Sequence, residues 1–213
     1  MKWIIPLLGL LFMLFFFIYL LCRKNKPKET RGIILTALAL AVYHLGDVGL
    51  WGGWYYELVR RIASVGFYFL VPFLLLTMYM LLPKENRGWF IKVFTWLMII
   101  PWIIALVIVY KSPLIFLEEM GGGNESMTYA LVLAFIIAFI FIISNGFRTV
   151  KLRSDETGKN MGKKLAVSLI VMLILYLLLW GSIDAFGYDA TYLFAVANII
   201  WALIIWPPAL KEK

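Results

Sequence analysis

The chain contains a single cysteine, Cys22, and a single histidine, His44, among its 213 residues. One cysteine excludes an internal disulfide, a CxxC redox pair and a cysteine-rich metal site, and one histidine excludes a bis-histidine haem within this chain. The sequence also lacks a GxSxG serine motif, an HExxH metal motif and a phosphate-binding loop. The last apolar run, residues 190–208, has no lysine for a retinal Schiff base. We therefore expect a non-enzymatic protein that needs no cofactor and no metal.

Charged residues are scarce as well. They make up 15% of the chain and hydrophobic residues 63%, whereas soluble domains carry about 25% charge. A soluble fold of this length has too little interior for so much apolar surface, so we expect lipid to surround most of the chain. The net charge of +8 comes from basic residues in the turns between apolar runs. That distribution is typical of a positive-inside membrane protein and predicts no nucleic-acid partner.

Seven apolar runs follow one another, and a membrane helix needs about 20 residues. They cover residues 3–22, 32–51, 58–82, 89–110, 128–147, 165–183 and 190–208. A basic cluster follows the first run and no small-residue cleavage site is present, so this run is expected to be a retained helix rather than a signal peptide. The pattern predicts an all-α membrane protein in which residues 1–213 form a single seven-helix transmembrane domain.

The distribution of lysine and arginine predicts the orientation. With the N-terminus outside, the cytoplasmic segments hold sixteen basic and five acidic residues, and the outer segments hold four basic and seven acidic residues. Because short cytoplasmic loops carry the excess of lysine and arginine, we expect the N-terminus outside and the C-terminus in the cytoplasm. The predicted location is the cell membrane, crossed several times.

The stretch 43–61, YHLGDVGLWGGWYYELVRR, carries the only histidine, two acids, two arginines, two tryptophans and three tyrosines in nineteen residues. Ionisable groups at membrane depth are costly, so they are expected to face the bundle interior and to pair. Arg61 is expected to pair with Glu57, Asp47 or Asp184. By itself, His44 is expected to be a hydrogen-bonded packing residue rather than a metal ligand.

His44 and Asp47 are three residues apart on the second helix, so they lie on one face. The third helix carries a polar stripe formed by Glu57, Arg61, Ser64 and Tyr68. Similar stripes are formed by Tyr176, Trp180 and Asp184 on the sixth helix and by Thr191 and Asn198 on the seventh. The functional interpretation is an outward-facing, aromatic-walled pocket, and the alternative is an interfacial aromatic belt with structural ion pairs. The candidate ligand-binding residues are His44, Asp47, Trp51, Trp54, Glu57, Arg61, Ser64, Tyr68, Trp180, Asp184, Tyr192 and Asn198.

Two further features concern partners other than the lipid bilayer. The basic loop 148–164 is a candidate contact for anionic lipid or a cytosolic partner, although topology alone accounts for its charge. Its candidate residues are Arg148, Lys151, Arg153, Lys163 and Lys164. Ala130, Ala134, Ala138 and Gly146 put small residues on one face of the fifth helix, which predicts helix packing first and a homodimer contact second.

The outer ends of the second and sixth helices have similar sequences. The segments LGDVGLWGGWYY and LWGSIDAFGYDATY each place glycine and an acid among aromatic residues, and a basic loop precedes both helices. This would fit two parallel repeats of three helices around a linker helix, as in small three-one-three solute transporters. Alternatively, any outward helix end attracts aromatic residues and an acid.

Several features together carry a resemblance. The second helix ends in glycine and tryptophan, the third reads RRIASVGFYFLVPFLLLTMYM with Gly66, Pro72 and Tyr79, and a polar turn precedes the seventh. With these features the chain resembles the N-terminal seven-helix sensor region of prokaryotic histidine kinases. The resemblance implies a sensor of small or membrane-derived signals that relays to a cytosolic domain. No output domain follows residue 213, so we expect either a fragment or a separate cytosolic or membrane signalling partner.

The preferred functional hypothesis is thus a receptor-like or accessory membrane module. The alternatives are a small three-one-three solute transporter and a structural subunit of a membrane complex.

Overall fold

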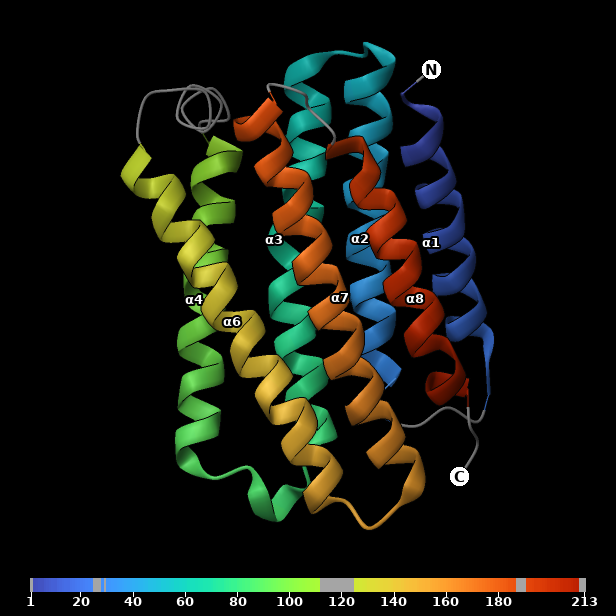
Figure 1. Ribbon diagram of the computed structural model, residues 1–213, viewed down its shortest axis with the longest axis vertical. Coiled ribbons are helices and arrows are strands. Elements are labelled where there is room, and N and C mark those ends of the chain that lie inside the picture. The colour runs from blue at the N-terminus through green and yellow to red at the C-terminus, as the bar shows by residue number, and fades with distance from the viewer. Residues whose placement is uncertain (1, 25–27, 29, 112–124, 187–190, 211–213) are drawn as a thin grey trace.

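The computed structural model is a bundle of long, mainly antiparallel helices (Figure 1), and it describes residues 2–24, 28, 30–111, 125–186 and 191–210. Within these residues there is no strand. The α-helices are α1 (Ile4–Cys22), α2 (Thr30–Gly52), α3 (Tyr56–Leu81), α4 (Trp89–Lys111), α6 (Glu125–Leu152), α7 (Glu156–Phe186) and α8 (Phe194–Leu210). Two short 3-10 helices are η1 (Lys84–Asn86) and η2 (Thr191–Leu193). Each predicted apolar run corresponds to one of the α-helices.

Five helical segments are long and apolar enough to cross a membrane. They are Ile4–Cys22, Thr30–Gly52, Arg61–Leu81, Leu133–Leu152 and Glu156–Leu179. The described apolar parts of α4 and α8, Ile91–Ile104 and Phe194–Trp206, are shorter than 18 residues. These features are those of an all-helical membrane protein, which confirms the predicted fold class at that level.

The helices form a closed ring in chain order. Each contacts the next along α1, α2, α3 and α4 and again along α6, α7 and α8, while α1 meets α8 and α3 meets α6 (Figure 1). Additional contacts join α2 to α8 and α3 to α7, so these four helices surround the centre of the bundle. In lipid, packing rather than hydrophobic exclusion holds helices together, and the largest fully buried side chains include Trp102, Trp201, Phe16 and Phe139.

Glycines allow α2 and α3 to approach more closely than side chains would permit. A Cβ on Gly66 would overlap backbone atoms of Tyr43, and one on Gly46 would overlap backbone atoms of Ala63. Such small-residue contacts are the usual means of close helix packing in membranes. The interface is the most extensive between any two helices of the described chain, and it fixes α2 as a rigid support for its polar residues.

A glycine turn ends α2. The N–H of Trp54 donates to the carbonyl of Gly49 at 2.9 Å, and Gly53 between them has a φ of 74°. This is the Schellman arrangement, in which the left-handed residue is almost always glycine. The turn lies at the upper end of the bundle in Figure 1, together with the beginning of α1.

Two arginines cap the lower end of α3. Arg87 donates to the carbonyls of Leu82 and Met80, both at 2.9 Å. Arg153 donates to the carbonyl of Leu81 at 3.0 Å and forms a two-pronged ion pair with Asp155, at 2.7 and 3.1 Å. The exposed carbonyls at the end of a helix carry a partial negative charge, so both guanidinium groups stabilise this end.

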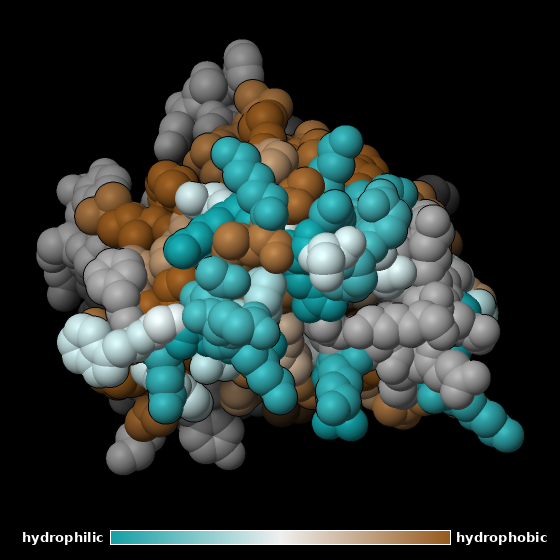
Figure 2. Space-filling view, turned by 90° about the horizontal axis from the view of Figure 1, so that it is seen from below, coloured by the Kyte–Doolittle hydropathy of each residue, from teal (hydrophilic) through white to brown (hydrophobic). Residues whose placement is uncertain are grey.

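The predicted basic loop 148–164 is wrong in its extent, because most of it is helical. Helix α6 continues to Leu152 and α7 begins at Glu156, which leaves only three connecting residues. Asp155 provides the reason: its carboxylate accepts a hydrogen bond from the N–H of Gly158 at 2.9 Å and thereby caps α7. The lower face of the molecule is nevertheless rich in hydrophilic side chains (Figure 2).

The small-residue face predicted on residues 130–146 packs within the chain. Ala138 is fully buried, and Ala134 lies partly buried against the core. A Cβ on Gly146 would lie 2.9 Å from the Cβ of Ala166 on α7, so α6 and α7 are closest there. The side chain of Ala130 lies outside the described residues. Helix packing therefore accounts for this face, and a homodimer through it remains only a prediction.

Candidate functional site

A cluster of polar side chains lies inside the bundle, away from its charged ends. Helix α2 contributes His44 and Asp47, α7 contributes Tyr176, and α8 contributes Asn198. The exposed fractions of these four residues are 0%, 6%, 3% and 0%. Because polar groups buried in lipid or protein are costly unless they are hydrogen-bonded, three helices that share such a cluster constrain one another.

The hydrogen bonds of the cluster form a chain from Tyr176 through Asn198 to His44. The hydroxyl of Tyr176 donates to Oδ1 of Asn198 at 2.5 Å, which orients the amide so that Nδ2 faces Nε2 of His44 at 3.0 Å. Since an amide nitrogen only donates, Nε2 is the acceptor and a neutral ring carries its proton on Nδ1. That Nδ1 faces Oδ2 of Asp47 at 3.6 Å, slightly beyond hydrogen-bond length. The carboxylate of Asp47 thus lies beside the ring that Asn198 contacts, but among the described residues Nδ1 of His44 has no hydrogen-bond partner.

A glycine on α1 makes room for the histidine. A Cβ on Gly9 would lie 2.7 Å from the Cβ of Ala195 and 3.2 Å from Cδ2 of His44. Any larger residue at this position would push α1 away from α8 or displace the imidazole. The cluster is therefore enclosed by four helices, α1, α2, α7 and α8.

An aromatic pair lies nearer the upper end than the cluster, since Trp51 follows Asp47 by four residues on α2 and Tyr192 precedes Asn198 by six. The rings of Trp51 on α2 and Tyr192 in η2 meet edge to face at 5.4 Å. The ammonium group of Lys2 lies 5.0 Å from the first ring and 5.6 Å from the second, a cation–π arrangement. We call these three residues the upper cap. They come from three separate segments, so the cap depends on how α1, α2 and η2 are placed.

The position of the cluster follows from helix geometry. His44 lies eight residues before the end of α2 at Gly52, which corresponds to roughly 12 Å along the axis at 1.5 Å per residue. Asn198 lies four residues after the start of α8. The cluster therefore sits below the upper end and above the middle of the bundle.

Below the cluster, large apolar side chains fill the bundle. Trp201 lies one turn further down α8, is 1% exposed and meets the ring of Phe16 edge-on at 6.4 Å. Leu40 on α2 and Met172 on α7 are also almost completely buried. The indole Nε1 of Trp201 has no hydrogen-bond partner among the described residues. Buried polar residues further down, such as Thr36 on α2 and Ser168 on α7, donate to carbonyls of their own helices instead of bonding between helices.

The structure separates the other candidate residues from this cluster. Tyr68 is 2% exposed but belongs to an aromatic group with Phe67 and Trp102, at centroid distances of 5.8 and 5.9 Å. Trp54 is 57% exposed on the upper turn, and Arg61 and Ser64 are partly buried on α3. The side chains of Glu57, Trp180 and Asp184 lie outside the described residues. The predicted pairing of Arg61 with Glu57, Asp47 or Asp184 stays a prediction.

Sequence reasoning left four contributors out of the site. Tyr176 was assigned to a polar stripe but not to the candidate set, and Lys2, Gly9 and Trp201 were not considered. The spacing of Tyr192, Ala195, Asn198 and Trp201 on one face of η2 and α8 is the signal that could have found the last of them. Gly9 carries no such signal, since its role depends on a contact between distant helices. Within the described residues, no group of three histidine, cysteine or acidic side chains could hold a metal ion.

No protein-family model, curated protein or solved structure matches this chain. The functional argument therefore depends on the geometry of the cluster and of its cap.

Proposed function

We propose that the protein is a non-enzymatic, receptor-like or accessory module of the cell membrane with an outward-facing site. It crosses the membrane seven times, with its N-terminus outside and its C-terminus in the cytoplasm. Supporting this orientation, the connections α1–α2, α3–α4 and α6–α7 all lie at the lower end, where the basic residues gather (Figures 1 and 2). Short basic loops on one side are the positive-inside pattern, which makes the lower end cytoplasmic.

One observation carries the receptor assignment: Trp51 of the upper cap follows Asp47 of the buried polar cluster by about one turn on α2. A small polar ligand that displaces Trp51 or Tyr192 would reach groups that can both donate and accept hydrogen bonds. Asn198 is hydrogen-bonded to both His44 on α2 and Tyr176 on α7. A ligand that replaces either hydrogen bond would therefore change how that helix is attached to α8. A signal of this kind requires only a shift between two arrangements of the bundle.

The lower end offers a route to a partner. Arg153 ties the end of α3 to the loop before α7, so a movement of α7 would act on the contact with Leu81. In this account, Arg148, Lys151 and Lys163 are exposed and available to anionic lipid or a cytosolic partner, and Lys164 is partly so. Arg153 itself is only 11% exposed and is already bonded within the chain, so its proposed role is to transmit rather than to bind.

A three-one-three solute transporter is the second candidate. Its support is the pattern of helix contacts. If α1, α2 and α3 are exchanged with α6, α7 and α8, each contact within one group matches a contact within the other. The same exchange turns the α2–α8 contact into the α3–α7 contact. Transport, however, requires the site to open to both sides in turn. The apolar packing of Trp201 and Phe16 below the cluster disfavours an inward path for a polar solute.

A flux measurement separates the two functions. The purified protein is reconstituted in proteoliposomes and assayed with radiolabelled sugars, amino acids and organic acids, with protein-free vesicles as control. A receptor predicts no uptake above the control. Saturable uptake of any of these solutes that Asn198→Leu abolishes would instead establish the transporter.

A further inference from the structure

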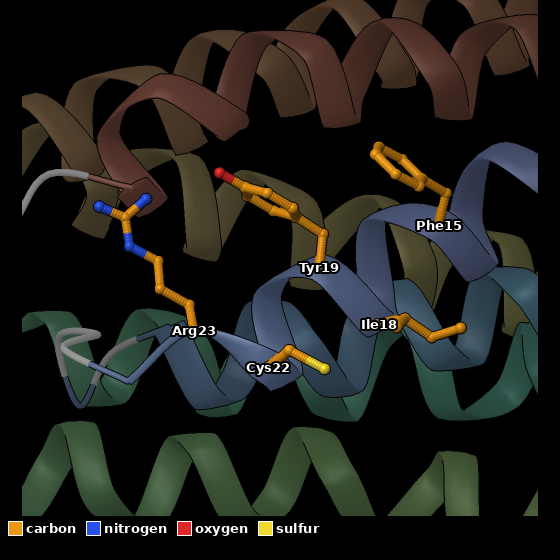
Figure 3. Close-up of a pocket in the computed structure, with 5 residues that line it drawn as sticks. All are labelled: Phe15, Ile18, Tyr19, Cys22 and Arg23. Atoms are coloured by element: carbon orange, nitrogen blue, oxygen red, sulfur yellow. The ribbon is translucent and has the colours of Figure 1, made fainter.

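A groove runs along the lower half of α1, on the side that faces α8. It has a volume of about 440 Å³ and is lined by Phe15, Ile18, Tyr19, Cys22 and Arg23 (Figure 3). All five residues come from one helix or its first following residue, so the groove follows the helix axis. From Phe15 to Arg23 it extends for roughly 12 Å at 1.5 Å per residue.

One aromatic ring of α8 packs beside the groove. Trp206 lies 5.8 Å from the ring of Phe15 and 5.3 Å from that of Tyr19, measured between ring centroids. Phe15 is still 56% exposed and Ile18 54% exposed, on a helix whose composition predicts that it is surrounded by lipid. The middle of the groove is therefore apolar and open to hydrocarbon.

The lower end of the groove is polar and cationic. The guanidinium of Arg23 and the hydroxyl of Tyr19 project from the same side of α1 (Figure 3). The connection to α2 that follows contains Lys24, Lys26 and Lys28 against one acid, Glu29. Because α1 ends at Cys22, these groups lie where the hydrocarbon gives way to the headgroup layer.

We propose that this groove binds one anionic phospholipid of the cytoplasmic leaflet. Its phosphate contacts Arg23 and the hydroxyl of Tyr19, and one acyl chain lies along Phe15 and Ile18 against Trp206. Two observations favour a phospholipid. The groove length of roughly 12 Å is close to the ~15 Å of one leaflet, half of a ~30 Å hydrocarbon core. The charge at its end complements a phosphate, which a guanidinium can contact with two parallel hydrogen bonds.

The assignment to the cytoplasmic leaflet rests on the proposed orientation, but the site is distinct from the polar cluster. It lies on the outside of the bundle, near the lower end, whereas the polar cluster lies inside near the upper end. Cys22 lines the groove but plays no part in the binding. Lipid bound here would press on α1 and α8, which also enclose His44.

Native mass spectrometry of the purified full-length protein tests the site. Protein is released from nanodiscs that contain equal amounts of phosphatidylglycerol and phosphatidylcholine, and the lipids retained per chain are counted. Wild type is expected to retain one phosphatidylglycerol in preference to phosphatidylcholine. Arg23→Gln should lower that retention at least tenfold, since it removes the direct hydrogen bonds of a guanidinium to the phosphate, and a hydrogen bond to a charged group is worth roughly 1.5 kcal/mol or more. Ile18→Trp, which fills the groove, should lower the retention of both lipids.

Two matched controls make the result decisive. Lys24→Gln removes the same charge one residue further on, and Leu8→Trp adds the same bulk at a position of α1 that is 55% exposed but outside the groove. Both should retain phosphatidylglycerol as wild type does. Equal losses in Lys24→Gln and Arg23→Gln, equal retention of the two lipids by wild type, or a dimer in place of retained lipid would each overturn the proposal. If Ile18→Trp melts well below wild type, the Arg23→Gln and Lys24→Gln comparison decides alone.

Discussion

The amide nitrogen of Asn198 on α8 lies 3.0 Å from Nε2 of His44 on α2, and both side chains are completely buried. The two residues are 154 positions apart, so this contact joins two helices that are distant in the sequence, in the upper half of the bundle. The other end of the same amide accepts a hydrogen bond from Tyr176 on α7. One side chain therefore determines the relative placement of three helices, and most predictions below concern it or the ends of the bundle.

Removing Asn198 should destabilise the bundle more than removing a buried asparagine that bonds only its own helix. Asn198→Ala leaves both His44 and Tyr176 without their partner, at a cost of about 1–3 kcal/mol. Asn145→Ala is the matched control, because Nδ2 of Asn145 donates to the carbonyl of Phe141 within α6. Thermal unfolding in detergent measures both. Equal melting temperatures for the two variants would contradict an interhelical role.

The Tyr176–Asn198 bond should show measurable coupling. Interhelical hydrogen bonds in membranes average ~0.6 kcal/mol and reach ~1.7 kcal/mol. A double-mutant cycle of Tyr176→Phe and Asn198→Ala should therefore give a coupling energy in this range, with the double variant less destabilised than the sum of the singles. Strict additivity would mean that the two groups do not interact.

Gly66 should tolerate no side chain. An alanine there would press its Cβ against the backbone of Tyr43, and overpacking typically costs ~1–3 kcal/mol. At Gly88 a Cβ would meet no atom within 4 Å, so Gly88→Ala serves as the control and should be close to neutral. Expression yield and melting temperature in detergent provide the measurement. A wild-type-like Gly66→Ala would contradict the close approach of α2 and α3.

The cap on α3 should require arginine at position 153. Arg153→Lys keeps the charge but loses the two-pronged contact with Asp155, and hydrogen bonds to charged groups are worth roughly 1.5–3 kcal/mol. We expect Arg153→Lys and Arg153→Ala to lower the melting temperature alike, while Lys151→Ala, at an exposed position of α6, should have little effect. Full rescue by lysine would show that charge alone matters.

Thiol labelling tests the orientation. In a Cys22→Ser background, a cysteine in place of Tyr55, which is 71% exposed on the upper turn, should react with a membrane-impermeant reagent in intact cells. A cysteine in place of Ser154, exposed between α6 and α7, should react only after permeabilisation. The reverse labelling pattern would mean that the basic end of the bundle lies outside the cell and that the proposed site faces the cytoplasm.

Composition and hydropathy predicted the helices well, because length and apolar content alone determine where a chain can remain in lipid. The boundary error at residues 148–164 arose because basic residues were read as loop, although lysine and arginine extend from helix ends towards the interface. The packing role of the α2–α3 glycines was not predicted, although Gly66 is one of the residues that carry the resemblance. Gly46 and Gly66 face each other's helices only after the chain has folded, and nothing in the local sequence gives their register.

The candidate site could be predicted in part. The one-turn spacing of His44 and Asp47 on α2 placed both on one face, where the structure also has them. Asn198 was included through the stripe on its own helix, but its contact with His44 depends on the closure of the ring between α1 and α8. Tyr68 shows the limit of such reasoning, since a stripe on α3 does not reveal that its ring packs against Trp102 instead.

The most direct test of the outward-facing site is the accessibility of position 198 from each side of the membrane. Asn198→Cys in a Cys22→Ser background is compared with the same variant carrying Trp51→Ala, which removes part of the upper cap. With an impermeant thiol reagent applied to oriented membranes, the first protein should be protected from both sides. The second should react from the outer side and remain protected from the cytoplasmic side. Reaction from the cytoplasmic side, or protection from both sides in the second protein as well, would contradict an outward-facing site above the polar cluster.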